Sequence, residues 1–323
     1  MPYHDISPSI RINYTIHQPS TPTTRPWLVL INGLADPQTT WAAQVPAFTE
    51  AGYTVLTYDN RGVGLSSRPE TDDEVYTAAT MASDLRSLVK ALNLPAAAPY
   101  HVMGVSMGGM IAQTYALAYC VPGAEGEGEI ASLTLACTYA APGPFCGRMF
   151  ALWREMALRM SIADVMRDVV LWAFTPAFFA DPARRDDLAA MEEEMARIDT
   201  DMGLRSYLAQ LNVITEFDTR AEVGRLAAAV AGMQVVVLAG EGDILIPVAL
   251  SNELHGLIPG SRWRTTRGGH ACMWEFPDEF NRSCLEEWRA LEGSDGHRQQ
   301  GMMGGPGGTA LTLRYVVSSR CCE

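Results

Sequence analysis

A serine flanked by glycines lies in the segment His101 to Met110, HVMGVSMGGM. Ser106 follows a short apolar run and precedes an apolar stretch with helical spacing, which predicts a sharp turn from a strand into a helix. At such a turn the serine backbone is strained, and side chains at Gly104 or Gly108 would collide with neighbouring backbone. The Met107 N–H would begin the helix, where unpaired amides favour a developing negative charge. We therefore predict Ser106 as a catalytic nucleophile and Met107 as an oxyanion donor.

A serine hydroxyl is a weak nucleophile near neutral pH, so it needs a base within hydrogen-bond reach. His270 is the candidate base, because the sequence RGGH follows the last predicted strand in a glycine-rich loop. Ligands of open α/β sheets bind at the carboxyl ends of the strands, so this loop can share a site with Ser106. The five other histidines are less suitably placed: His4, His17, His101, His255 and His297.

The base in turn needs an acid to orient it, and this acid is expected between the serine and the histidine in chain order. Asp243 follows a strongly apolar run, VVVL, and lies in the sequence AGEGDILIP. It is the preferred candidate, since flanking glycines and the following apolar residues would bring its carboxylate into a dry site. Glu241 is a local alternative and Asp218 a more distant one. An aspartate in a turn after a strand can also be purely structural.

A second oxyanion donor is expected from the loop after the first central strand. The sequence there is NGLA, in which Gly33 permits an unusual backbone and Leu34 can present its N–H. An Asn-Gly pair also occurs in ordinary turns. Combined with the serine turn, we predict the oxyanion role for Leu34.

Short apolar runs alternate with helical segments along most of the chain, which predicts an α/β fold with a mostly parallel central sheet flanked by helices. An alternating segment, Ile10 to His17, is expected to form an antiparallel edge. The expected strands are Trp27 to Asn32, Tyr53 to Asp59, Tyr100 to Val105, Ser132 to Thr138, Met233 to Ala239 and Trp263 to Thr266. The expected helices are Trp41 to Ala51, Ala78 to Leu92, Met107 to Tyr119, Arg220 to Ala231, Ala249 to Leu257 and Pro277 to Leu291.

This alternation stops between residues 142 and 217, where helix-forming blocks carry many aromatic residues. We predict a helical cap there, standing over a core made of residues 1–141 and 218–292. Trp153, Trp172 and Phe174 are its candidate substrate-binding residues, although any one of them can instead be simple core. Residues 293–323 contain the sequence GMMGGPGG and are expected to be a flexible tail without chemistry.

Composition narrows the possible partners. The 323 residues carry a formal charge of −13, which argues against nucleic acid and anionic membrane surfaces. The amino-terminal sequence resembles no signal peptide, so a cytoplasmic location is expected.

Seven cysteines without metal-type spacing are interpreted as reduced packing residues. We predict neither a cofactor nor a metal, and the oligomeric state is left open.

Several motifs together resemble the α/β-hydrolase superfamily, especially its 3-oxoadipate enol-lactonase-like and small esterase members. They appear in the expected order between about residues 10 and 291: LINGL, YDNRGVGLS, the Ser106 turn, GEGD followed by Pro247, and Gly269-His270 before an apolar helix. The resemblance implies a triad of Ser106, His270 and Asp243, with Leu34 and Met107 as oxyanion donors. Relatives mostly have His-Gly where this chain has Asn32-Gly33.

The leading hypothesis is a serine hydrolase that cleaves an ester or lactone of a small hydrophobic or amphipathic substrate. The same triad also serves C–C bond hydrolases and acyltransferases, and the fold can serve as a weakly catalytic ligand receptor. Arg61 and Arg148 lie near the predicted cleft and could bind an acidic substrate, although a structural role is the commoner one for such arginines.

Overall fold

The computed structural model describes residues 2–71, 74–94, 99–227 and 232–302. Its centre is a sheet in which eight strands lie in the order β1-β2-β4-β3-β5-β6-β7-β8. The β1–β2 and β2–β4 pairs are antiparallel and the other pairs are parallel, as predicted. The strands are β1 (Tyr3–Asp5), β2 (Arg11–His17), β3 (Trp27–Ile31), β4 (Thr54–Tyr58), β5 (Tyr100–Val105), β6 (Ile130–Ala136), β7 (Gln234–Gly240) and β8 (Arg262–Thr266).

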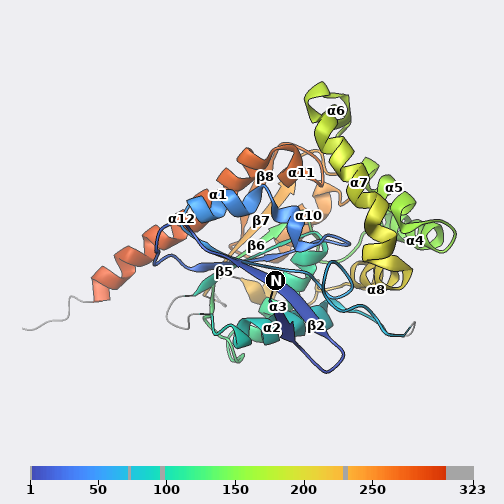
Figure 1. The fold of residues 1–323 in the computed structure, drawn as a ribbon. Coiled ribbons are helices and arrows are strands. Elements are labelled where there is room, and N and C mark those ends of the chain that lie inside the picture. Colours follow the sequence, from blue (N-terminus) through green and yellow to red (C-terminus); the bar gives the residue numbers. More distant parts are fainter. Residues whose placement is uncertain (1, 72–73, 95–98, 228–231, 303–323) are drawn as a thin grey trace, which may run out of the picture.

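Helices cover both faces of this sheet, which explains why its central strands are continuous apolar runs. Every residue of β4 and β5 is buried. On one face α1 (Gln44–Glu50) and α12 (Pro277–Met302) pack around Trp41, Phe48 and Trp288. On the other face lie α2 (Ala78–Ala91), α3 (Met107–Tyr119) and α10 (Val248–Leu257) (Figure 1). Two separate hydrophobic clusters therefore hold the sheet from both sides.

Local signals in the sequence account for the bounds of α2. The Thr77 hydroxyl accepts a hydrogen bond from the Thr80 N–H at 3.0 Å, which caps the first turn. Beyond the last turn, Asn93 has a φ of 47°, a left-handed conformation that asparagine tolerates better than most residues. The helix therefore ends at Ala91, one residue before the expected end at Leu92.

The chain between β6 and β7 forms a group of helices that stands apart from the sheet (Figure 1). Pro176 and Pro182 begin helices in this group, because a proline at the first position loses no helical hydrogen bond. The group consists of α4 (Pro144–Ala157), α5 (Ile162–Ala173), α6 (Pro176–Ala180), a short 3-10 helix at Pro182–Arg184, α7 (Arg185–Asp201) and α8 (Gly203–Thr215).

Three expectations about secondary structure need correction. β2 is not the edge of the sheet, because β1 pairs along its outer side. In the described part of the helix expected from Arg220 to Ala231, residues 220–227, only a 3-10 turn at Val223–Leu226 forms, and residues 228–231 lie outside the described residues. The last helix does not end at Leu291 but continues to Met302, so the described part of the predicted tail is helical.

Residues 303–323, which include Cys321 and Cys322, lie outside the described residues. The other five cysteines are free and buried, as expected of packing residues. Within the described parts of the chain, no helix is both long enough and apolar enough to cross a membrane.

Candidate active site

Ser106 lies between the end of β5 and the start of α3, with φ 57° and ψ −121°. Residues other than glycine rarely adopt this backbone conformation, and such strain costs about 1–3 kcal/mol. The two flanking glycines make the turn possible. A Cβ on Gly104 would lie 2.1 Å from the Gly108 carbonyl oxygen, and a Cβ on Gly108 would lie 2.1 Å from the Ile31 carbonyl oxygen. The predicted strand-turn-helix geometry is therefore present.

His270 and Asp243 meet at the carboxyl ends of β7 and β8. The His270 Nδ1 donates to Oδ2 of Asp243 at 2.9 Å. The second oxygen of Asp243, Oδ1, accepts from the Ile246 N–H at 2.9 Å, and the carboxylate is fully buried. The two loops touch closely, since a Cβ on Gly240 would lie 2.0 Å from the Gly269 carbonyl oxygen. Because Nδ1 of His270 is bonded to Asp243, Nε2 is the ring nitrogen available to a nucleophile.

A buried carboxylate that sequence reasoning missed holds the histidine loop in place. Glu275 accepts from the Gly269 N–H at 2.6 Å and from the Thr175 N–H at 3.3 Å, and it also accepts from the Thr175 hydroxyl. The Ala271 N–H donates to the Ala173 carbonyl oxygen at 2.9 Å. The loop that carries His270 is therefore tied to the end of α5.

The alternative acids lie elsewhere. Glu241 is exposed and accepts from the Thr265 hydroxyl at 3.1 Å. Asp218 is exposed and pairs with Arg220 at 3.8 Å. Four of the other histidines bond to hydroxyl groups outside this region: His4 to Ser87, His17 to Thr57, His101 to Ser132 and His255 to Ser261. Among the described acids and histidines, only Asp243 and His270 form such a pair beside Ser106.

The loop after β3 is held rigidly by Asn32. Its side-chain Nδ2 donates to the Pro37 carbonyl oxygen at 2.9 Å and its Oδ1 accepts from the indole of Trp41 at 2.8 Å. Leu34 lines the cavity that contains Ser106, while Met107 is fully buried as the first residue of α3. Leu34 therefore lies in the same cavity wall as Ser106, and Met107 directly follows the serine at the start of α3; their role as oxyanion donors stays a prediction.

Ser106 and His270 line one cavity of about 850 Å³ beneath the helices between β6 and β7. Of the predicted substrate-binding aromatic residues, Trp153 and Phe174 contribute to its wall. Trp172 does not line the cavity, because its ring packs on Phe145 and its indole N–H donates to Asp168 at 3.2 Å. Tertiary packing also adds wall residues that the sequence did not single out: Phe150, Met191 and Trp274.

One group of side chains near the pair has ligand atoms close enough to consider a metal. Atoms of Cys137, Asp243 and His270 all lie within 4.8 Å of one another. However, the Cys137 thiol lies 3.6 Å from the sulfur of Cys272, and this contact together with burial raises the pKa of Cys137 well above its usual value. A neutral thiol is a poor metal ligand. The chemistry of this donor set therefore favours the hydrogen-bonded pair over a metal centre.

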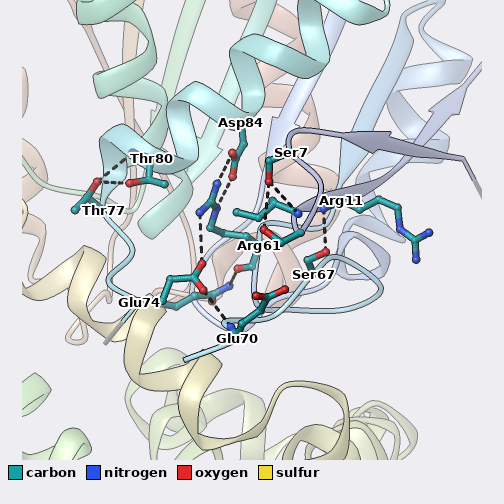
Figure 2. Close-up of polar contacts among 12 residues, drawn as sticks. Ser7, Arg11, Arg61, Ser67, Glu70, Glu74, Thr77, Thr80 and Asp84 are labelled. Atoms are coloured by element: carbon teal, nitrogen blue, oxygen red, sulfur yellow. Dashed lines mark hydrogen bonds and ion pairs between the residues drawn. The ribbon is translucent and has the colours of Figure 1, made fainter. Parts of the chain in front are cut away.

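Neither arginine considered as a partner for an acidic substrate lines the cavity. Arg61 is buried, and its guanidinium donates to both oxygens of Asp84 at 2.6 and 2.5 Å. Figure 2 shows Arg61 between Asp84 and Glu74, which lies 4.0 Å away. Arg148 is exposed and does not line the cavity. The structural role is therefore the correct one for Arg61.

Asp36 is a cavity residue that the sequence analysis did not consider. It lines the same cavity as Ser106 and His270. Burial and the Glu194 carboxylate raise the pKa of Asp36 to about 7, and the neighbouring His270 partly opposes this rise. The signal available in the sequence was its position, three residues beyond Gly33 in the predicted oxyanion loop.

The comparisons with known proteins agree with this fold. The family model of the alpha/beta hydrolase fold matches residues 26–277. A Cronobacter turicensis protein provisionally named carbamate hydrolase RutD is 29% identical over 257 residues, which cover 79% of this chain and 88% of that protein. An Escherichia coli protein of the same name is 29% identical over 275 residues, covering 82% of this chain and 91% of that protein.

Solved structures with the same fold include the enol-lactonase of Burkholderia xenovorans, with a TM-score of 0.72 and 24% identity. That comparison covers 88% of this chain and 98% of the lactonase. An esterase from Exiguobacterium antarcticum has a TM-score of 0.70 and 18% identity, and the match covers 87% of this chain and 96% of the esterase.

Proposed function

The chain belongs to the α/β-hydrolase family, and from this premise we propose that it is a serine hydrolase that cleaves a carboxylic ester or lactone. One observation carries the proposal: Ser106, whose backbone is strained, shares a cavity with His270, and Nδ1 of His270 is hydrogen-bonded to the buried Asp243. An orienting acid of this kind fixes the imidazole tautomer and stabilises the imidazolium that forms during attack.

In the proposed reaction the Ser106 hydroxyl oxygen attacks the substrate carbonyl carbon while its proton passes to Nε2 of His270. The carbonyl oxygen becomes an oxyanion, which accepts hydrogen bonds from the N–H groups of Leu34 and Met107. Losing one such donor typically costs about 2.7–4 kcal/mol of transition-state stabilisation. Collapse of the intermediate breaks the ester C–O bond, and His270 returns the proton to the leaving oxygen.

Water then completes the cycle. His270 takes a proton from the water as its oxygen attacks the acyl-enzyme carbonyl, and the bond to Ser106 breaks with return of the proton to the serine. The net result is the addition of one water across the ester or lactone bond. The helices formed by residues 142–217 act as a cap over the cavity. In this proposal Trp153 and Phe174 contact the apolar part of a small substrate.

A fluorophosphonate probe tests the nucleophile directly, since it labels only activated serines. We expect labelling of the parent protein and none of Ser106→Ala. Turnover of p-nitrophenyl esters of increasing chain length, measured beside a panel of lactones, then defines the preferred acyl group. Absence of both labelling and turnover would favour the ligand-receptor alternative over an enzyme.

C–C bond hydrolysis and acyl transfer remain alternatives that use the same residues. Cleavage of a diketone without ester turnover would indicate the first. Formation of a new ester from an added alcohol, at the expense of the free acid, would indicate the second. Because relatives carry a carbamate hydrolase name, a carbamate belongs in the same substrate panel.

A further inference from the structure

The carboxyl group of Asp36 lies against the proposed reaction centre. A Cβ built on Gly33 would lie 2.7 Å from Oδ2 of Asp36 and 3.5 Å from Cβ of Ser106. The carboxyl and the serine thus face the same small space beside the oxyanion loop. Ser106 and Asp36 line the same cavity, so an acyl group attached to Ser106 has room to extend past Asp36.

The arginines of the cavity wall are already engaged by the protein. Arg68 donates to the carbonyl oxygens of Thr200 and Asp201. Arg184 pairs with Asp187 at 3.0 Å and donates to the Glu275 carbonyl oxygen at 2.6 Å. Arg197 pairs with Asp201 at 4.0 Å. Arg184 and Arg197 are therefore paired with acids, whereas Arg68 is held by backbone carbonyl oxygens.

Asp36 and Glu194 differ from the other acids of this wall, which have hydrogen-bond or ion-pair partners. Asp59 accepts from the N–H groups of Gln38 at 2.7 Å and Leu65 at 3.0 Å. Within the described parts of the chain, by contrast, neither Asp36 nor Glu194 has a hydrogen-bond donor or an ion-pair partner. Glu194 is an exposed residue of α7 that also lines the cavity. Five acids line the cavity (Asp36, Asp59, Asp187, Glu194 and Asp201) against three arginines (Arg68, Arg184 and Arg197), so the formal charge of its wall is negative.

Building on the proposed esterase function, we propose that Asp36 is a specificity-determining residue that selects substrates with a cationic group, such as an ammonium, on the acyl chain. The mostly apolar wall would accommodate the hydrocarbon part, and the cation would form the ion pair that Asp36 does not have within the described parts of the chain. A fixed anion on the acyl chain would be rejected for the same reason. Glu194 adds to the field that draws the cation inward.

Protonation of the Asp36 carboxylate should make this selectivity depend on pH. Asp36 has a pKa near 7, raised by burial and by Glu194 and lowered by His270. A cation binds the ionised carboxylate better than the neutral acid, so preference for a cationic substrate should rise as pH increases through about 7. Taking the ratio of a cationic and a neutral ester removes the effects that the two substrates share.

The test compares two isosteric p-nitrophenyl esters of a butanoyl chain, one ending in trimethylammonium and the other in the neutral tert-butyl group. The measured quantity is the ratio of their kcat/KM values between about pH 6 and about pH 8. We expect a ratio above one that rises with pH in the parent protein. In Asp36→Asn the ratio should fall about tenfold and lose its pH dependence.

Two variants of α7 provide the matched comparison. Glu194→Gln should move the rise of the ratio to lower pH, because removal of that charge lowers the pKa of Asp36. Glu193→Gln removes the same charge from the neighbouring exposed residue, which does not line the cavity, and should leave the ratio unchanged.

A ratio at or below one that Asp36→Asn does not alter would overturn the inference while leaving the esterase proposal intact. Turnover of neither ester, together with no fluorophosphonate labelling, would instead refute the esterase proposal itself. The two failures are thus distinguishable in one set of measurements.

Discussion

The His270 imidazole donates a hydrogen bond from Nδ1 to Oδ2 of Asp243 at 2.9 Å. The Asp243 carboxylate is completely buried from solvent. A buried carboxylate is stabilised only by such partners, so this bond orders both side chains. It also links two loops that leave adjacent parallel strands, β7 and β8.

Removing the nucleophile should abolish turnover without unfolding the protein. Ser106→Ala deletes a hydroxyl on which the turn geometry does not depend, and alanine fits the same space. We expect ester hydrolysis to fall by several orders of magnitude, with the melting temperature kept or slightly raised. His270→Ala should be similarly inactive. Turnover within about tenfold of the parent in Ser106→Ala would contradict the assignment.

Parallel substitutions distinguish the two neighbouring acids. Asp243→Asn should lower kcat by orders of magnitude, because the amide no longer stabilises the imidazolium. Glu241→Gln should have a mild effect, since that side chain is exposed and bonds to Thr265. Steady-state kinetics of both variants decide the matter. A severe defect in Glu241→Gln beside a nearly normal Asp243→Asn would reverse the assignment.

Glu275 should support both stability and turnover through the histidine loop. Glu275→Ala leaves the buried Gly269 N–H without its acceptor, and each unsatisfied donor costs about 1–3 kcal/mol. We expect a lower melting temperature and a reduced kcat. Glu279→Ala is the control, because Glu279 bonds to Arg267 at the protein surface. If the two variants have equally small effects, Glu275 does not hold the loop.

Asp36 should make stability depend on pH. Its folded-state pKa of about 7 lies above the ordinary aspartate value of 3.8, so the folded state binds more protons between these values. Stability should therefore fall as pH rises from about 4 to about 7 and then level off. Asp36→Asn should remove this loss and stabilise the protein at pH 8 by up to a few kcal/mol, with little effect near pH 4. Denaturant unfolding at several pH values measures the difference, and a difference that does not vary with pH would refute it.

The chain after Gly293 should be dispensable for activity. Glu292 accepts from the Tyr53 hydroxyl at 2.5 Å and pairs with Arg25, so the helix is anchored up to that residue. Truncation after Gly293 keeps this anchor and should preserve the melting temperature and turnover. Truncation after Leu291 removes the anchor and should lower the melting temperature. Loss of solubility or of most activity in the longer variant would show that the chain beyond Gly293 has a role.

Features that depend on local pattern were determined by the sequence alone. The Ser106 turn needs only a strand, a helix and two glycines whose missing side chains make room, and all of these lie within a few residues. The alternation of apolar runs with helical segments likewise predicted the sheet and its covering helices. Strands as short as β1 carry too little pattern to be recognised, because β1 forms only by pairing with β2.

Features that depend on contacts between distant segments were decided only by the tertiary structure. Asp243 and Glu241 have nearly the same sequence context, and only the approach of the His270 loop distinguishes them. The same holds for Trp172, which faces Phe145 although its neighbour Phe174 lines the cavity. Arg61 is neutralised by Asp84 on another element. Charge, burial and orientation arise when such segments pack together, and no local pattern in the chain encodes them.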